Sequence, residues 1–191
     1  MKKVILIGGS SSTGKSYLAK QLAEKYRMSL IEIDDIRIAL QSKLKPADFP
    51  NLFFFVENKN YLTDNSVEFL LSKLESVGVE IWPALNSLID KHIACNEPVI
   101  FEGDGIIPKL AASRNQENIQ SIFIYDDKEN ILQKELKRQR GGVNPNLEKQ
   151  VEFSHQHGQM IKSQAESLGL ITISASPQET LFERTIKLLE N

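Results

Sequence analysis

The stretch Gly9-Ser10-Ser11-Ser12-Thr13-Gly14-Lys15-Ser16, followed by Tyr17, fits the pattern G-x-x-x-x-G-K-[ST]. It lies between the apolar run of residues 4–7, which predicts a buried strand, and residues 15–26, whose apolar side chains recur at helical spacing. A glycine-rich turn in this context directs backbone N–H groups at phosphate oxygens, and the start of the helix adds a positive dipole end. The sequence therefore predicts that residues 9–17 bind the phosphates of a nucleotide.

Two side chains of this stretch carry the expected chemistry. We expect Lys15 to neutralise the β- and γ-phosphates of ATP and the Ser16 hydroxyl to ligate Mg²⁺. The alternative is a Gly/Ser turn with an exposed lysine. We favour the nucleotide, because the motif falls between a predicted strand and a predicted helix, where its chemistry requires it.

Composition limits the class of protein. The chain has 191 residues, of which 41% are hydrophobic and 25% charged, and its formal net charge is −2. Such a charge provides no overall positive field for nucleic acid, so we do not expect nucleic acid as a partner. The single Cys95 forms no internal disulfide, the first residues hold no signal-peptide core, and no apolar run approaches the roughly 18–20 residues of a membrane span. We expect a cytoplasmic protein without membrane contact, and the oligomeric state stays open.

Strands and helices alternate along the chain. Four further apolar runs predict strands at residues 30–33, 98–101, 121–125 and 170–173. Helical patterns cover residues 35–43, 66–76, 80–95, 128–140, 147–168 and 178–189. This alternation predicts an α/β layer sandwich with right-handed crossovers, whose ligand site lies beyond the carboxyl ends of the strands.

The middle of the chain reads as a helical insertion, at about residues 45–96. Residues 45–65, with prolines around Phe53-Phe54-Phe55, predict a partly helical segment that covers a site. Gly78 separates two predicted helices, and Pro83 suits only the first turn of the second one. We expect Trp82 and the phenylalanine cluster to pack a core or a flap.

Acidic residues follow the second predicted strand. Asp34 and Asp35 come directly after it, and Arg37 follows within the next helix. At the carboxyl edge of a parallel sheet, such a carboxylate can orient or deprotonate a substrate hydroxyl. Helix capping is the alternative, with Asp34 as the predicted cap.

A second acidic group ends the third predicted strand. Glu102 is placed to hold Mg²⁺ through water, and Gly103-Asp104-Gly105 keeps the following backbone open. An ordinary Gly-Asp-Gly turn is the alternative. Because a terminal glutamate in a buried strand is costly unless it is paired or linked to a metal, we favour a functional Glu102 and a weaker role for Asp104.

Basic residues end the helix predicted at 128–140. Arg138 and Arg140 precede Gly141-Gly142, and we expect a lid at about residues 138–147 that closes over the phosphates. A favourable interaction of cations with the carboxyl end of a helix is the alternative.

Two histidines lie further along the chain. His155 and His157 are two positions apart on a predicted helix and have no metal-binding cluster around them. We expect both to be solvated.

The chain resembles P-loop kinases of small molecules and, among them, 2-phosphoglycerate kinase-like P-loop proteins. In those proteins an Asp-x-x-Arg-like element follows the second strand, and a strand that ends in Glu-Gly leads to a proline. The residues that carry the resemblance are Gly9 to Ser16, Asp34 with Arg37, Phe101-Glu102-Gly103 with Pro108, and Arg138 with Arg140.

The resemblance implies a fold, cofactors and an acceptor site. The fold is a P-loop NTPase three-layer sandwich in one domain, residues 1–191, with a five-stranded parallel sheet of order 2-3-1-4-5, a helical flap and a lid. The cofactors are ATP and Mg²⁺, and the acceptor binds between strands two and three. From the residues themselves we expect catalysis by Lys15, Asp34 or Asp35, Arg138 and Arg140, acceptor binding by Asp34, Arg37, Glu102 and Gly103, and metal binding by Ser16 and, through water, Glu102.

These features predict an ATP-dependent phosphotransferase that moves the γ-phosphoryl group to a hydroxyl of a small, anionic metabolite. A nucleoside, nucleotide or polynucleotide 5′-hydroxyl kinase is one alternative, and a non-catalytic, nucleotide-binding regulatory protein is another. A GTP switch does not fit, since Tyr125-Asp126-Asp127-Lys128 supplies no guanine-reading Asn-Lys-x-Asp element. The segment after Gly103 lacks the histidine expected from the resemblance, so the acceptor stays open.

Overall fold

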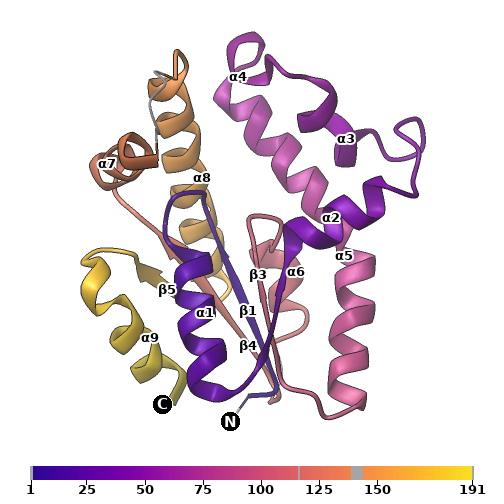
Figure 1. The fold of residues 1–191 in the computed structure, drawn as a ribbon, viewed down its shortest axis with the longest axis vertical. Coiled ribbons are helices and arrows are strands. Elements are labelled where there is room, and N and C mark those ends of the chain that lie inside the picture. Colours follow the sequence, from indigo (N-terminus) through magenta and orange to yellow (C-terminus); the bar gives the residue numbers. More distant parts are fainter. Residues whose placement is uncertain (1, 116, 139–143, 191) are drawn as a thin grey trace.

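Five parallel strands form the central sheet of the computed structural model, which describes residues 2–115, 117–138 and 144–190 (Figure 1). Their spatial order is β2-β3-β1-β4-β5, as predicted. The strands are β1 (Val4–Gly9), β2 (Ser29–Glu32), β3 (Val99–Glu102), β4 (Ile119–Tyr125) and β5 (Ile171–Ser174).

Helices connect the strands and cover the sheet. None of those in the described ranges is both long and apolar enough to cross a lipid bilayer. The helical elements are α1 (Lys15–Tyr26), α2 (Ile33–Gln41), α3 (Pro50–Glu57), α4 (Tyr61–Asp64), α5 (Val67–Ala94), α6 (Pro108–Ala112), α7 (Lys128–Arg138), α8 (Leu147–Ser167), the 3₁₀ turn η1 (Gln178–Thr180) and α9 (Leu181–Glu190).

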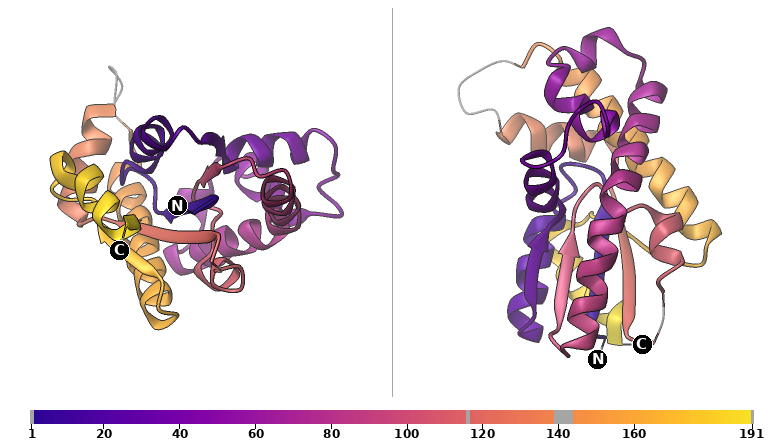
Figure 2. Two further views of the ribbon diagram at one scale, coloured as in Figure 1. Left: turned by 90° about the horizontal axis from the view of Figure 1, so that it is seen from below. Right: turned by 90° about the vertical axis from the view of Figure 1, so that its right-hand side faces the viewer.

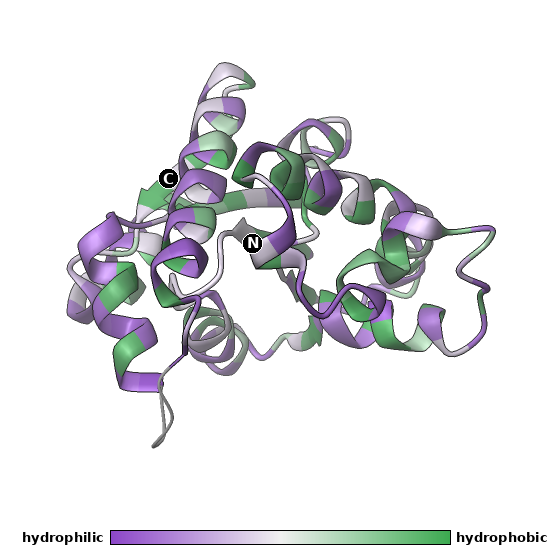
Figure 3. Cartoon of the chain, turned by 90° about the horizontal axis from the view of Figure 1, so that it is seen from above, coloured by the Kyte–Doolittle hydropathy of each residue, from purple (hydrophilic) through white to green (hydrophobic). Residues whose placement is uncertain are grey.

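The sheet is buried on both faces, which explains why its central strand is continuously apolar. Ile5 and Ile7 belong to a cluster with apolar residues of α1 and α9, whereas Val4 and Leu6 belong to a cluster with residues of α5 and α8. Figure 3, which looks onto the carboxyl edge of the sheet, shows hydrophobic and hydrophilic segments alternating along the helices that surround the strands. The molecule is therefore a three-layer sandwich, as predicted.

Parallel pairing brings the polar strand ends to one edge of the sheet. Glu32 of β2 and Glu102 of β3 are register partners, and Glu102 is also the partner of Ile7 in β1. The loop that follows β1 lies at this same edge, above the sheet in the view of Figure 1. Strand order alone thus places two glutamates beside the predicted phosphate loop.

The helix break predicted at Gly78 is wrong, because α5 runs unbroken through both Gly78 and Pro83. Gly78 packs against the segment after β3, where a Cβ atom on it would lie 2.8 Å from the carbonyl oxygen of Gly105. A proline inside a helix costs about 3 kcal/mol. Burial of Ile81 and Leu85 beside Pro83 offsets this cost, so tertiary packing overrides the local preference.

One other predicted boundary needs correction. Helix α2 already begins at Ile33 with Glu32 at the N-cap position, so Asp34 lies in the first helical turn and is not the cap. Helix α7 is described as far as Arg138, and residues 139–143 of the predicted helix end and lid lie outside the described residues.

The insertion is helical and lies beyond the carboxyl edge of the sheet. Helices α3 and α4, here called the flap, pack on α5, and Figure 2 shows them projecting past the strands. Phe53 is buried, Trp82 packs against the same apolar cluster, and Phe55 meets Tyr61 edge to face with ring centroids 5.0 Å apart. The aromatic residues thus pack a core and a flap, as expected.

Replacing Gly78 tests the close approach of α5. Gly78→Ala gains about 1 kcal/mol of helix propensity but forces a methyl group onto the Gly105 carbonyl, and overpacking costs about 1–3 kcal/mol. We expect a net loss and a melting temperature lower by roughly 2–4 °C in thermal unfolding. Ser72→Ala, at an exposed position of α5, is the matched control. A Gly78→Ala variant as stable as this control contradicts the packing argument.

Candidate active site

The loop between β1 and α1 depends on glycine for its backbone conformation and is held by hydrogen bonds within the loop. At Gly9, φ is 141°, and a Cβ atom there would collide with the backbone oxygen of Ile124. The Thr13 hydroxyl and the Lys15 ammonium both donate to the Ser10 carbonyl, at 2.8 and 2.9 Å. The backbone therefore curves around its own lysine, the conformation expected of a phosphate loop.

Lys15 is a buried cation held by Asp104. Its side chain is 8% exposed, and its ammonium lies 2.6 Å from the Asp104 carboxylate, which also accepts a hydrogen bond of 2.7 Å from Ser11. Burial is the largest single effect and opposes ionisation of Asp104, but the charges of Lys15 and His157 and the hydrogen bonds from Lys15 and Ser11 together outweigh it and lower the pKa of Asp104. Asp104, for which the sequence favoured a weaker role than for Glu102, is thus the carboxylate that pairs with Lys15.

Glu102 is a second buried carboxylate, 4% exposed, at the end of β3. Burial raises its pKa, against the opposing effects of the Ser16 hydroxyl and Lys15. No group of three or more His, Cys, Asp or Glu able to hold a metal by itself occurs in the part of the chain that the structure describes. A serine hydroxyl beside one carboxylate instead fits Mg²⁺, which proteins bind through few side chains, water and substrate phosphates.

These groups surround a polar cavity of about 200 Å³, here called the phosphate cavity. It brings together eight of the predicted site residues from four separate segments of the chain. Its lining consists of Ser11, Ser12, Lys15, Ser16, Glu32, Asp34, Glu102, Gly103, Asp104 and Arg138.

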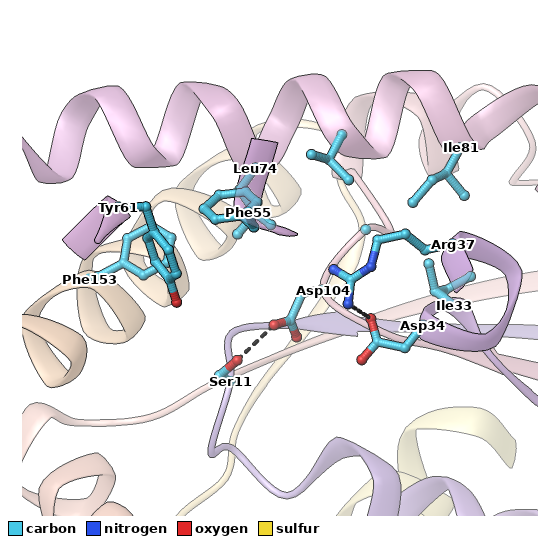
Figure 4. A pocket seen from close by; sticks show the side chains of 12 residues that line it. Ser11, Ile33, Asp34, Arg37, Phe55, Tyr61, Leu74, Ile81, Asp104 and Phe153 are labelled. Carbon is cyan, nitrogen blue, oxygen red and sulfur yellow. Dashed lines mark hydrogen bonds and ion pairs between the residues drawn. The ribbon is translucent and has the colours of Figure 1, made fainter. Parts of the chain in front are cut away.

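A second cavity of about 290 Å³, here called the flap cavity, adjoins the first and shares Ser11, Asp34 and Asp104 with it. Figure 4 shows the Asp104 carboxylate between the aromatic rings of Phe55, Tyr61 and Phe153 on one side and Arg37 with Asp34 on the other. The remaining lining residues are Ile33, Phe55, Tyr61, Leu74, Val77, Ile81, Gly105 and Phe153.

The geometry separates the two aspartates that the sequence left equivalent. The Asp34 carboxylate forms an ion pair with Arg37, with 2.9 Å between its Oδ1 atom and a terminal guanidinium nitrogen, and Asp34 lines both cavities. Asp35 is exposed like Asp34 but lines neither cavity, because successive helix positions face different directions. Tyr17, 62% exposed, also lies outside both cavities.

Arg138 reaches the phosphate loop through a contact that the sequence did not reveal. Its guanidinium donates to the Ser12 hydroxyl at 2.9 Å, and Ser12 in turn contacts the buried Glu135, which also accepts from Gln150 at 3.0 Å. Glu135 therefore anchors the loop to α7. Arg140 lies outside the described residues.

Helix α8 packs against the phosphate loop on one side of the site. The prediction that His157 on this helix is solvated is wrong. His157 is 4% exposed, whereas His155 is partly exposed. On the same face of α8, the Ser154 hydroxyl donates to the Ser11 carbonyl at 2.7 Å. The spacing of Val151, Ser154 and Ile161 with His157 marks a buried helix face, which was the available signal.

Sequence comparisons find relatives among kinases. No family model matches the chain. It is 27% identical over 127 residues to a 2-phosphoglycerate kinase of Methanocaldococcus jannaschii. This match covers 63% of this chain and 40% of that protein. It is 24% identical over 148 residues to a 2-phosphoglycerate kinase of Pyrococcus horikoshii, and the match covers 74% of this chain and 48% of that protein. The chain thus spans about half the length, or less, of these curated relatives.

Solved structures share the whole fold. The shikimate kinase of Acinetobacter baumannii, in complex with shikimate, superimposes with a TM-score of 0.57 at 13% identity, covering 100% of this chain and 94% of that one. TT1252 from Thermus thermophilus superimposes with a TM-score of 0.59 at 15% identity, covering 99% of this chain and 96% of that one. The fold is therefore that of P-loop kinases. In sequence and fold the chain resembles P-loop small-molecule kinases, including those named 2-phosphoglycerate kinase.

The buried His157 predicts an acid-sensitive fold. Burial lowers its pKa from 6.5 to about 4, with Asp104 opposing the shift. Between these pH values the unfolded chain binds a proton that the folded protein does not. The stability contributed by the neutral imidazole is complete above pH 6.5 and falls by on the order of 3 kcal/mol as the pH drops towards 4.

Thermal unfolding of His157→Gln measures this effect. We expect the variant to lose less stability than the native protein between pH 7 and pH 5. His155→Gln, on the same helix, serves as the control and is expected to follow the native pH profile. Identical pH profiles for all three proteins would refute the burial argument.

Proposed function

We propose that this protein is an ATP-dependent phosphotransferase that moves the γ-phosphoryl group to a hydroxyl of a small anionic molecule. The observation that carries the proposal is the pair of adjoining cavities, one lined by the phosphate loop and the other by Arg37 and the flap. They meet at Ser11, Asp34 and Asp104. A donor in one cavity and an acceptor in the other would bring the reacting groups together, which is the main requirement of phosphoryl transfer.

Nucleotide binding exchanges the partner of Lys15. In the structure Lys15 pairs with Asp104, 2.6 Å away. The β- and γ-phosphates offer several anionic oxygens to the same ammonium, while the loop amides and the start of α1 bind the remaining ones. Ser16 and, through water, Glu102 would hold Mg²⁺. When bound, Mg²⁺ neutralises charge on the phosphates.

Asp34 orients the acceptor and takes its proton. It lines both cavities and is fixed by Arg37, so its carboxylate can accept the hydrogen bond of an acceptor hydroxyl. The acceptor oxygen bonds to the γ-phosphorus, the bond from that phosphorus to the β–γ bridging oxygen breaks, and the proton passes to Asp34. ADP leaves with the bridging oxygen. Arg138, beside the phosphate loop, stabilises charge on the transferred group.

Single-turnover transfer from γ-labelled ATP with Mg²⁺ into a pool of small acceptors tests the proposal. We expect a labelled product with the native protein. Lys15→Ala and Asp34→Asn should lower its rate by about 10²–10⁴-fold, because each removes a charged group at the reacting centre. Asp35→Asn is the matched control and should keep the rate within about twofold, since a carboxylate outside both cavities touches no reactant.

Two results would contradict the proposal in different ways. Tight binding of Mg–ATP without a labelled product from any pool would favour a regulatory nucleotide-binding protein. Equal loss of transfer in Asp34→Asn and Asp35→Asn would show that Asp34 has no special position in the reaction.

A further inference from the structure

We infer that the acceptor is a hydroxy acid with a single anionic group and an apolar, ring-bearing body. This inference rests on the proposed phosphotransferase activity and adds the chemical class of its second substrate. It follows from three properties of the flap cavity: an end lined by aromatic side chains, an end with a guanidinium, and two carboxylates that repel further anions.

The aromatic end is formed by the flap and by α8. Phe55 of α3 and Tyr61 of α4 meet edge to face, and Phe153 of α8 lines the same cavity. Leu74 and Val77 of α5 continue the apolar lining. Aromatic rings of a ligand gain from burial of their area and from edge-to-face contact with such side chains. A polar, fully hydroxylated acceptor would leave this wall without a partner.

The cationic end is Arg37, the one cationic side chain among the described residues that line the flap cavity. One terminal nitrogen of its guanidinium donates to Asp34. The Nε atom is buried and has no hydrogen-bond partner. A buried donor without a partner is costly, and the planar guanidinium matches a carboxylate with two parallel hydrogen bonds. The geometry therefore favours a carboxylate bound beside Asp34.

The flap cavity offers one cation among its described lining residues, which limits the ligand to one anionic group. Asp34 and Asp104 place two carboxylates on the cavity against the single guanidinium of Arg37. Lys15 neutralises Asp104 in the structure, but in the proposed reaction it turns to the nucleotide phosphates. A molecule with both a carboxylate and a phosphate, such as 2-phosphoglycerate, would meet like charges that weaken its binding. This chain's cavity thus departs from the substrate in the names of its curated relatives.

Cavity size agrees with a molecule of one ring. The flap cavity has a volume of about 290 Å³. Small-molecule sites usually span roughly 300–1,000 Å³, so this one suits a ligand below drug size.

A matched panel of acceptors tests the inference by binding and by transfer. The panel is 3-phenyllactate, its neutral amide, glycerate and 2-phosphoglycerate. Binding is measured by calorimetry with Mg²⁺ and a non-hydrolysable ATP analogue, and transfer with ATP. We expect 3-phenyllactate to bind about tenfold or more tightly than each of the other three, because only it satisfies both ends of the cavity.

Variants separate the two ends. Phe55→Ala should weaken binding of 3-phenyllactate about tenfold and leave that of glycerate within twofold, while Val56→Ala, an exposed neighbour on α3, should change neither. Arg37→Gln should abolish the preference for the acid over its amide. Thermal unfolding of each variant checks that it is folded.

The outcomes distinguish this inference from the proposed function. Binding of 3-phenyllactate without transfer supports the ligand class and contradicts the phosphotransferase. Transfer to 2-phosphoglycerate or glycerate in preference to 3-phenyllactate supports the phosphotransferase and overturns the inference. Absence of binding by 3-phenyllactate, or binding that Phe55→Ala leaves intact, also overturns it.

Discussion

The site depends on one buried cation. Lys15 lies inside the loop that follows β1, where the Ser10 carbonyl accepts from its ammonium and Asp104 neutralises its charge. A buried ammonium without a partner would be strongly unfavourable. The ion pair therefore joins the phosphate loop to the segment after β3, and the Ser11–Asp104 hydrogen bond adds a second connection between them. In the proposed function, a nucleotide phosphate replaces Asp104 at this cation.

Sheet topology makes this pairing possible. Because β3 lies next to β1, the residues after both strands meet at one edge, where Glu102 and Asp104 face the loop. The unbroken α5 then carries the flap above this edge, and its close approach at Gly78 seats it on the same segment. The phosphate cavity and the flap cavity are consequences of one strand order and one long helix.

The sequence predicted what depends on local pattern. The phosphate loop, the strands and their order, and the carboxylates at strand ends all followed from motif, periodicity or resemblance. Contacts between distant segments did not: Ser11 and Asp104 are 93 residues apart, and Ser12 and Glu135 are 123 apart. Local preference also misled at Pro83, where packing keeps the helix intact. At His157, the short spacing from His155 predicted a solvated pair, whereas the helical spacing of Val151, Ser154 and Ile161 places His157 on the buried face of α8.

In the proposed function, Asp104 and the nucleotide compete for Lys15, and the dissociation constant of Mg–ATP tests this competition most directly. Calorimetry would compare the native protein with Asp104→Asn and with Asp48→Asn, whose side chain is exposed and lines neither cavity. Removing the competing charge should make Asp104→Asn bind Mg–ATP about tenfold more tightly, with Asp48→Asn unchanged. Equal or weaker binding by Asp104→Asn would contradict the exchange.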